Sequence, residues 1–309
     1  MDPGNPIVMH FASGTSLFSG GTLLLLVMAA SSRLKRRWRR TVRDSATLLG
    51  AALMLLSATP APAILIWAVP AIALAWIVCE HIRRTWAEKT AMFCRGMLAV
   101  LIVLAIAAEI PHRLMPTLPA GTHDRIVVLG DSLSQGILPG VSWPKSLTAR
   151  HAVDTLNLAR NGATAADALT QAAGIPADAD LVVIEIGGND MLGGTPVQQF
   201  SKDLDALLTK VRRKGRVVIM LELPLPPLYE EWGRVQRGLA GKHGVLLLPK
   251  SRFAAVLATA GAVEDGLHLS AKGADIMGDM IFDALKPILR IRTGAPRPFE
   301  AIGMAGRLE

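Results

Sequence analysis

The stretch Arg125-Ile126-Val127-Val128-Leu129-Gly130-Asp131-Ser132 decides the fold of the second half of this 309-residue chain. A short continuous run of apolar, mostly β-branched residues is typical of a strand that is covered on both faces of a sheet. The glycine, aspartate and serine that follow are typical of a tight turn into a helix. We therefore expect a buried parallel strand that carries Ser132 to its carboxyl end.

Four more runs of the same kind follow, and amphipathic stretches separate them. The further strands are expected at about 153–158, 181–186, 217–221 and 245–248. Helices are expected near 143–150, 164–173, 196–213, 228–241 and 271–289. This alternation predicts an α/β domain over residues 124–290, with a doubly wound parallel sheet of five strands. In such sheets the chemistry lies at the carboxyl ends of the strands.

Small polar segments lie at those strand ends in an order that suits acyl transfer. Ser132 is the candidate nucleophile, and His268 is the base that would take its proton. Asp265 can bind the other nitrogen of the His268 ring. The backbone N–H groups of Ser132 and Gly162 and the amide of Asn189 are candidate donors to an oxyanion. Each segment alone is a common turn, but their combination predicts a serine hydrolase.

The same segments resemble the sequence blocks of the SGNH (GDSL) hydrolase superfamily. Within it, residues 124–289 are most similar to the thioesterase I, lysophospholipase L1 and arylesterase group. The matching motifs are Gly-Asp-Ser-Leu-Ser at 130–134, Trp143-Pro144, Gly-Gly-Asn-Asp at 187–190 with Leu192 and Gly194, and Asp-Gly-Leu-His at 265–268. The resemblance implies a three-layer, flavodoxin-like domain. It also implies Ser132, Asp265 and His268 as the triad, Ser132, Gly162 and Asn189 as the oxyanion hole, and no cofactor or metal.

An apolar loop, residues 223–229, follows the fourth strand. We expect Leu225, Leu228 and Tyr229 from this loop, with Leu192, to bind the substrate. Contact with a bilayer and plain packing within the domain are the alternatives. His243 is expected in an exposed turn.

The first half of the chain has a different composition. Hydrophobic residues make up 51% of the whole sequence and charged residues only 19%. A helix that spans a membrane needs about 20 mostly apolar residues. Apolar runs at 8–30, 45–59, 63–79 and 91–110 therefore predict an all-α transmembrane region of about four helices within residues 1–110. Proline and glycine mark residues 111–123 as a linker, and residues 291–309 are expected to form a flexible tail.

Most of the net charge of +8 belongs to the apolar half, because residues 1–115 hold 12 Lys and Arg against 5 Asp and Glu, a net charge of +7. This distribution favours membrane topology over nucleic-acid binding. Basic residues at 33–43 and 81–89 are expected on the cytoplasmic side. The N-terminus and the hydrolase domain would then be extracytoplasmic, on a bacterial-type inner membrane. Cleavage after Ala105-Ile106-Ala107 is an alternative that would free the domain.

The remaining composition narrows the function. Two cysteines exclude a disulfide framework, and no Cys/His spacing matches a metal site. We predict a membrane-anchored extracytoplasmic serine esterase that needs no cofactor and acts on a lysophospholipid, an acylated glycan or a small acyl ester. One alternative is an O-acyltransferase or deacetylase of a surface polysaccharide. Another is a non-catalytic membrane scaffold or acyl-ligand-binding protein. The oligomeric state stays open.

Overall fold

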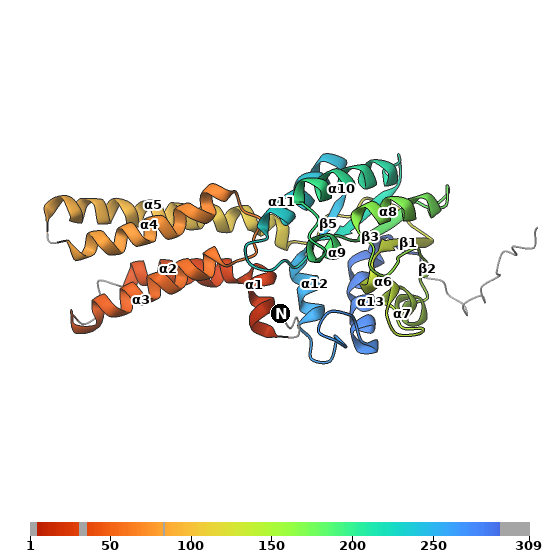
Figure 1. The fold of residues 1–309 in the computed structure, drawn as a ribbon, viewed down its shortest axis with the longest axis horizontal. Coiled ribbons are helices and arrows are strands. Elements are labelled where there is room, and N and C mark those ends of the chain that lie inside the picture. The colour runs from red at the N-terminus through yellow and green to blue at the C-terminus, as the bar shows by residue number, and fades with distance from the viewer. Residues whose placement is uncertain (1–4, 31–35, 83, 291–309) are drawn as a thin grey trace, which may run out of the picture.

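The computed structural model describes residues 5–30, 36–82 and 84–290, with the side chains of 36–39 excepted. The described chain is elongated, with a helical region at one end and an α/β domain at the other (Figure 1). The tail predicted to be flexible, residues 291–309, lies outside the described residues.

Five helices make up the first region. They are α1 Pro6–Ala12, α2 Thr15–Ala30, α3 Arg36–Leu55, α4 Ala63–His81 and α5 Thr85–Glu109. The pairs α2/α3 and α4/α5 each lie side by side (Figure 1). The connection from α3 to α4 and the end of α5 lie beside the α/β domain, whereas the start of α3 and the end of α4 lie at the far end of the molecule.

Two helices are long and apolar enough to cross a membrane, over Ala63–His81 and Thr85–Arg113. A third candidate arises if α1 and α2, which meet at an 84° bend, form one span. In the described residues α3 is not a candidate span, because it begins nine residues before the predicted run, inside the basic segment. It also ends at Leu55 rather than near 59. A fourth span at α3 therefore stays a prediction.

The α/β domain confirms the predicted sheet. Its strands are β1 Arg125–Gly130, β2 Asp154–Asn157, β3 Leu181–Glu185, β4 Val217–Leu221 and β5 Leu246–Leu248. All are parallel and follow the order β2-β1-β3-β4-β5. Strands β1 and β3 are almost wholly buried, as their continuous apolar runs require.

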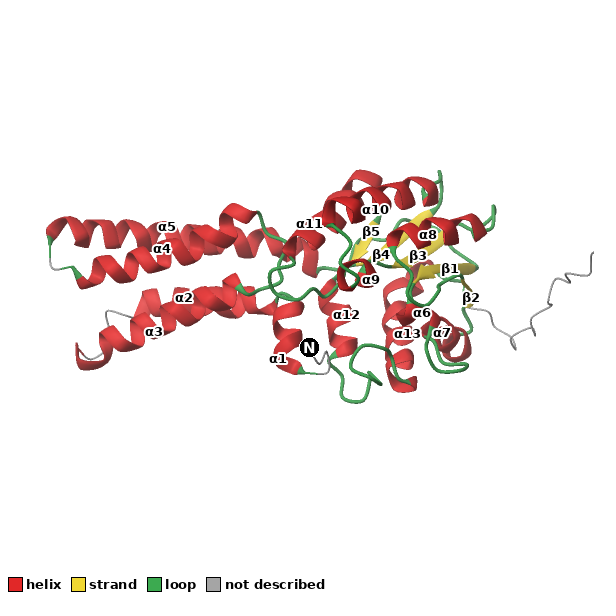
Figure 2. Cartoon of the chain, viewed as in Figure 1, coloured by secondary structure: helices red, strands yellow, loops and turns green. Residues whose placement is uncertain are grey.

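Helices cover both faces of this sheet (Figure 2). One layer holds α8 Ala165–Gln171, α10 Val197–Val211 and α11 Glu230–His243, and the other holds α7 Trp143–His151, α12 Lys250–Leu257 and α13 Ala271–Leu285. The short helices α6 Ser132–Gln135 and α9 Gly188–Leu192 follow β1 and β3. The sequence analysis predicted a turn into a helix at Ser132, where α6 begins, but it predicted neither α9 nor α12.

The expectation of an exposed turn at His243 was wrong. His243 is buried at the end of α11, and its Nε2 lies 2.6 Å from Oδ1 of Asp205 on α10. This carboxylate is 38 residues away in the sequence, so the local pattern around His243 held no sign of it.

Candidate active site

The first catalytic segment is the turn from β1 into α6. Asp131 caps α6, and its Oδ1 accepts a hydrogen bond of 3.0 Å from the backbone N–H of Leu133. Ser132 is therefore the first residue of the helix, and it is half-buried. Gly130 leaves no room for a side chain, because a Cβ there would lie 2.7 Å from Ser134 Oγ and 2.9 Å from the carbonyl oxygen of Glu185. The glycine lets β1 and β3 approach closely beneath the serine.

The second segment is the turn after β2. The backbone N–H of Arg160 donates to the carbonyl oxygen of Gly130 at 3.1 Å, which ties this turn to the end of β1. Gly162 is exposed and has φ +73°, a conformation that favours glycine. A Cβ at Gly162 would meet nothing within 4 Å, so the backbone conformation and not lack of space calls for glycine there.

The third segment is the turn from β3 into α9, and it carries Asn189. Its Nδ2 donates to Oδ2 of Asp131 and to the carbonyl oxygen of Ala163, both at 3.1 Å. Asp131 precedes Ser132, and Ala163 follows Gly162. The Asn189 amide therefore binds one residue next to Ser132 and one next to Gly162, and these are the other two predicted oxyanion donors. The structure thus brings Ser132, Gly162 and Asn189 to one place at the carboxyl edge of the sheet.

The fourth segment is the loop before α13. His268 Nδ1 lies 2.7 Å from Oδ2 of Asp265, and the backbone N–H of His268 donates to Oδ1 of Asp265 at 2.8 Å. These hydrogen bonds, the backbone one foremost, lower the pKa of Asp265 well below its ordinary range. The carboxylate therefore stays ionised and fixes the ring, as the predicted pair requires.

Ser132 and His268 lie on different segments of the site, since Ser132 begins α6 and His268 lies in the loop before α13. In the part of the chain that the structure describes, no hydrogen bond joins Ser132 Oγ to the His268 ring. His268 is nevertheless near the serine turn: burial raises the pKa of the neighbouring Asp131, and the charge of His268 opposes that rise. Catalytic hydrogen bonds are often long in the absence of substrate.

Two buried carboxyl groups support the oxyanion segments. Glu185, the last residue of β3, is fully buried and accepts a hydrogen bond of 3.0 Å from Ser134 Oγ. Burial, followed by the charge of Asp131, raises the pKa of Glu185 well above its ordinary range. Asp190 Oδ2 accepts from the backbone N–H of Ala165 at 2.9 Å, and burial raises the pKa of Asp190 to about 6. The sequence analysis missed Glu185, although one acid in an apolar strand was an available signal.

The predicted substrate-binding residues divide into two groups. Leu192, Leu228 and Tyr229 are exposed by 63%, 64% and 43%. Leu225 is fully buried, so it supports the loop and presents no surface to a substrate.

The α/β domain is similar to known lipases, esterases and thioesterases. Residues 128–276 match the GDSL-like Lipase/Acylhydrolase family. The esterase TesA of Pseudomonas aeruginosa is 30% identical over 53% of this chain and 89% of its own. Thioesterase 1/protease 1/lysophospholipase L1 of Escherichia coli is 27% identical over 56% of this chain and 88% of its own. A crystal structure of TesA covers 53% of this chain and 99% of its own, with a TM-score of 0.47 and 29% identity.

The family match and the two relatives define a serine hydrolase of the SGNH type, which acts on ester bonds. The chain belongs to the GDSL-like lipase/acylhydrolase family. The matched region lies within the α/β domain, so it leaves out the five N-terminal helices.

Proposed function

We propose that this protein is a membrane-anchored esterase whose hydrolase domain lies on the extracytoplasmic side. The described start of α3 and the end of α4, which border the two basic segments, lie at the end of the helical region remote from the hydrolase domain (Figure 1). Basic segments stay preferentially in the cytoplasm. That preference supports a cytoplasmic far end and an extracytoplasmic catalytic domain.

In the proposed reaction Ser132 Oγ attacks an ester carbonyl while His268 takes its proton, and Asp265 holds the ring. The alcohol leaves with that proton, and an acyl group remains on Ser132. Water then attacks the acyl-enzyme with His268 again as base, which frees the acid and restores the serine. Each oxyanion is stabilised by the backbone N–H groups of Ser132 and Gly162 and by the side-chain amide of Asn189. To donate to the oxyanion, the Asn189 amide gives up one of its two hydrogen bonds, to Ala163 or to Asp131.

One observation carries the proposal: the Asn189 amide joins Asp131 and Ala163, and so assembles three donors beside one serine. An outward-facing site would meet lysophospholipids, acylated glycans or small acyl esters. The esterase and lysophospholipase names of the relatives fit this range.

A fluorophosphonate probe that cannot cross membranes tests reactivity and placement together. In intact cells we expect it to label the wild-type protein and not the Ser132→Ala variant. A permeant probe serves as the control for a folded site. Labelling by the permeant probe alone would overturn the extracytoplasmic placement, and no labelling by either probe would overturn the esterase assignment.

A further inference from the structure

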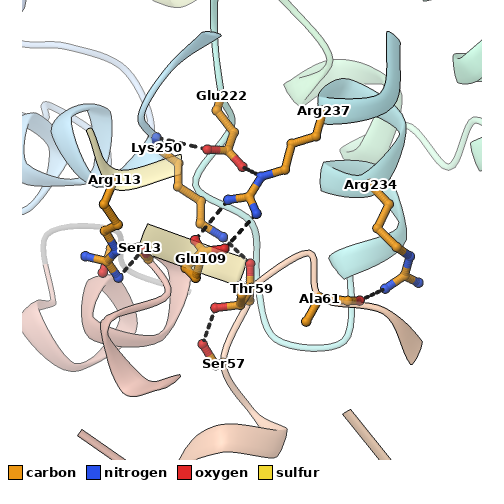
Figure 3. Close-up of polar contacts among 11 residues, drawn as sticks. Ser13, Ser57, Thr59, Ala61, Glu109, Arg113, Glu222, Arg234, Arg237 and Lys250 are labelled. Carbon is orange, nitrogen blue, oxygen red and sulfur yellow. Dashed lines mark hydrogen bonds and ion pairs between the residues drawn. The ribbon is translucent and has the colours of Figure 1, made fainter. Parts of the chain in front are cut away.

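A buried cluster of charged residues joins the helices to the hydrolase domain (Figure 3). Arg237 of α11 donates to both carboxylate oxygens of Glu109, the last residue of α5, at 2.6 and 2.9 Å. It also donates through Nε to Glu222, which follows β4, at 2.7 Å. The side chains of Glu109 and Glu222 are only 2% and 1% exposed. This two-pronged pairing fixes the orientation of the domain on α5.

The connection between α3 and α4 packs against the same side of the domain. Residues 57–61 of this connection are all buried. Lys250, the first residue of α12, donates through Nζ to the carbonyl oxygen of Ala58, and Arg234 of α11 donates to that of Ala61 at 3.0 Å. Pro60 packs against Gly233, where a Cβ would lie 2.4 Å from the proline Cγ. The connection at the domain end of the α3/α4 pair is therefore fixed to α11 and α12.

The loop of residues 223–229 runs from the oxyanion segments to the connection between α3 and α4. At its start, Leu223 lies against Gly187, where a Cβ would be 3.0 Å from the leucine Cδ1. In its middle, Leu225 lies beside the contact of Pro60 with Gly233. At its end, Leu228 and Tyr229 are exposed. One loop thus lies beside both the catalytic edge and the connection between α3 and α4.

The side chain of Leu228 is exposed and not buried. It has φ +71°, a conformation that leucine rarely adopts, and its backbone N–H donates to Oε1 of Glu230 at 2.9 Å. On the helices, Ile64 and Trp67 in the first turns of α4 are exposed by 76% and 63%. Both residues follow directly after the connection between α3 and α4. They therefore mark where α4 presents apolar side chains to lipid, at its end beside the hydrolase domain.

We propose that Leu228 and Tyr229 enter the bilayer leaflet on the domain side, and that esters resident in that leaflet reach Ser132 along the loop. This inference rests on the proposed membrane-anchored esterase. The occupant is lipid, because the loop is fixed beside the domain-side end of α4, and a tyrosine beside an aliphatic side chain suits the boundary between headgroups and acyl chains. In this arrangement the membrane helices hold the substrate loop in place as well as anchoring the enzyme.

Depth measurements on the full chain in phosphatidylcholine vesicles test the contact. In a chain with Cys79→Ala and Cys94→Ala, the substitution Leu228→Cys provides the site for an environment-sensitive fluorophore. The matched control is Ile137→Cys, because Ile137 is 38% exposed and follows α6, away from the helices. We expect lipids with a nitroxide on the upper acyl chain to quench the probe at 228 at least about threefold more than the probe at 137. Equal quenching at both positions would overturn the proposal.

Turnover tests the route of the substrate. In the Leu228→Ser/Tyr229→Ser variant, we expect the ratio of kcat/KM for a long-chain ester in vesicles to that for a short water-soluble ester to fall about tenfold. Ile137→Ser should leave this ratio unchanged. An unchanged ratio in the double variant would overturn the route. If the wild type hydrolysed neither ester, the proposed function would fail, whereas the quenching result would still decide whether the loop meets the leaflet.

Discussion

Two buried clusters of this molecule use carboxyl groups in opposite ways. At the junction between helices and domain, Glu109 and Glu222 both pair with Arg237. At the catalytic edge, Asp131 and Glu185 lie next to each other among neutral donors, and burial raises the pKa of both. A paired carboxylate keeps its charge and joins two parts, whereas a buried acid beside another acid tends to hold a proton.

The catalytic edge therefore serves the reaction, whereas the junction holds the helices and the hydrolase domain together. Substitutions of the catalytic groups themselves should lower activity with little effect on folding. Substitutions at the junction should lower the stability of the assembled chain and leave the triad intact. Four variants test this separation.

The largest effect is expected from Asp265→Asn. The asparagine would no longer stabilise the charged His268 ring or hold it in the required tautomer, so kcat should fall about 10⁴-fold. Steady-state hydrolysis of a soluble ester measures this, with Glu264→Gln as the control on the neighbouring exposed acid. The thermal unfolding midpoint should stay unchanged, and a large drop in that midpoint would blur the separation between the two clusters.

Arg237→Leu should have the next largest effect, on stability. It leaves two buried carboxylates unpaired, which typically costs about 3–5 kcal/mol. Chemical unfolding of the detergent-solubilised chain should show the loss. Arg150→Leu removes an exposed ion pair with Asp279, which water and salt screen, and it should lower stability far less than Arg237→Leu. If both variants lost the same stability, the junction would be no stronger than a surface pair.

Asn189→Ala returns to the catalytic edge. Loss of one oxyanion donor should lower kcat about 10²- to 10³-fold, with KM nearly constant. The acyl-enzyme should still form on Ser132, at a reduced rate, in a burst measurement. A rise in KM with constant kcat would instead assign Asn189 to substrate binding.

The catalytic edge could be proposed from the sequence because its signals are local. Each strand is a continuous apolar run, and each catalytic segment follows a strand or precedes the last helix within a few residues. The helix at α12 was missed, and the start of α3 lay in a basic stretch that carried no apolar pattern.

The junction could not be predicted in the same way. Arg237 meets Glu222 across 15 residues and Glu109 across 128, so only the folded chain shows that they pair. A single acid at the end of the last apolar run was the one available hint of Glu109. The burial of Leu225 could not be predicted either. In the sequence, an apolar loop residue that packs inward looks the same as one that faces a substrate.

The smallest effect is expected from Asp190→Asn, which tests the protonation of the catalytic edge. The pKa of Asp190 is raised by burial from 3.8 to about 6. Between these two values the folded state binds more protons than the unfolded state. The free energy of unfolding therefore falls as the pH rises from about 4 to about 6, and this contribution then stays level. An asparagine cannot titrate, so the variant lacks this dependence.

The measurement is the difference in unfolding free energy between wild type and Asp190→Asn at several pH values. It should shift by about 2 kcal/mol in favour of the variant between pH 4 and pH 7. Asp283→Asn, which changes an exposed acid of α13 that pairs with Lys286, is the matched control for the loss of one carboxylate. A constant difference for Asp190→Asn would mean that this carboxylate is already ionised at pH 4. The contrast with the junction would then be limited to Asp131 and Glu185.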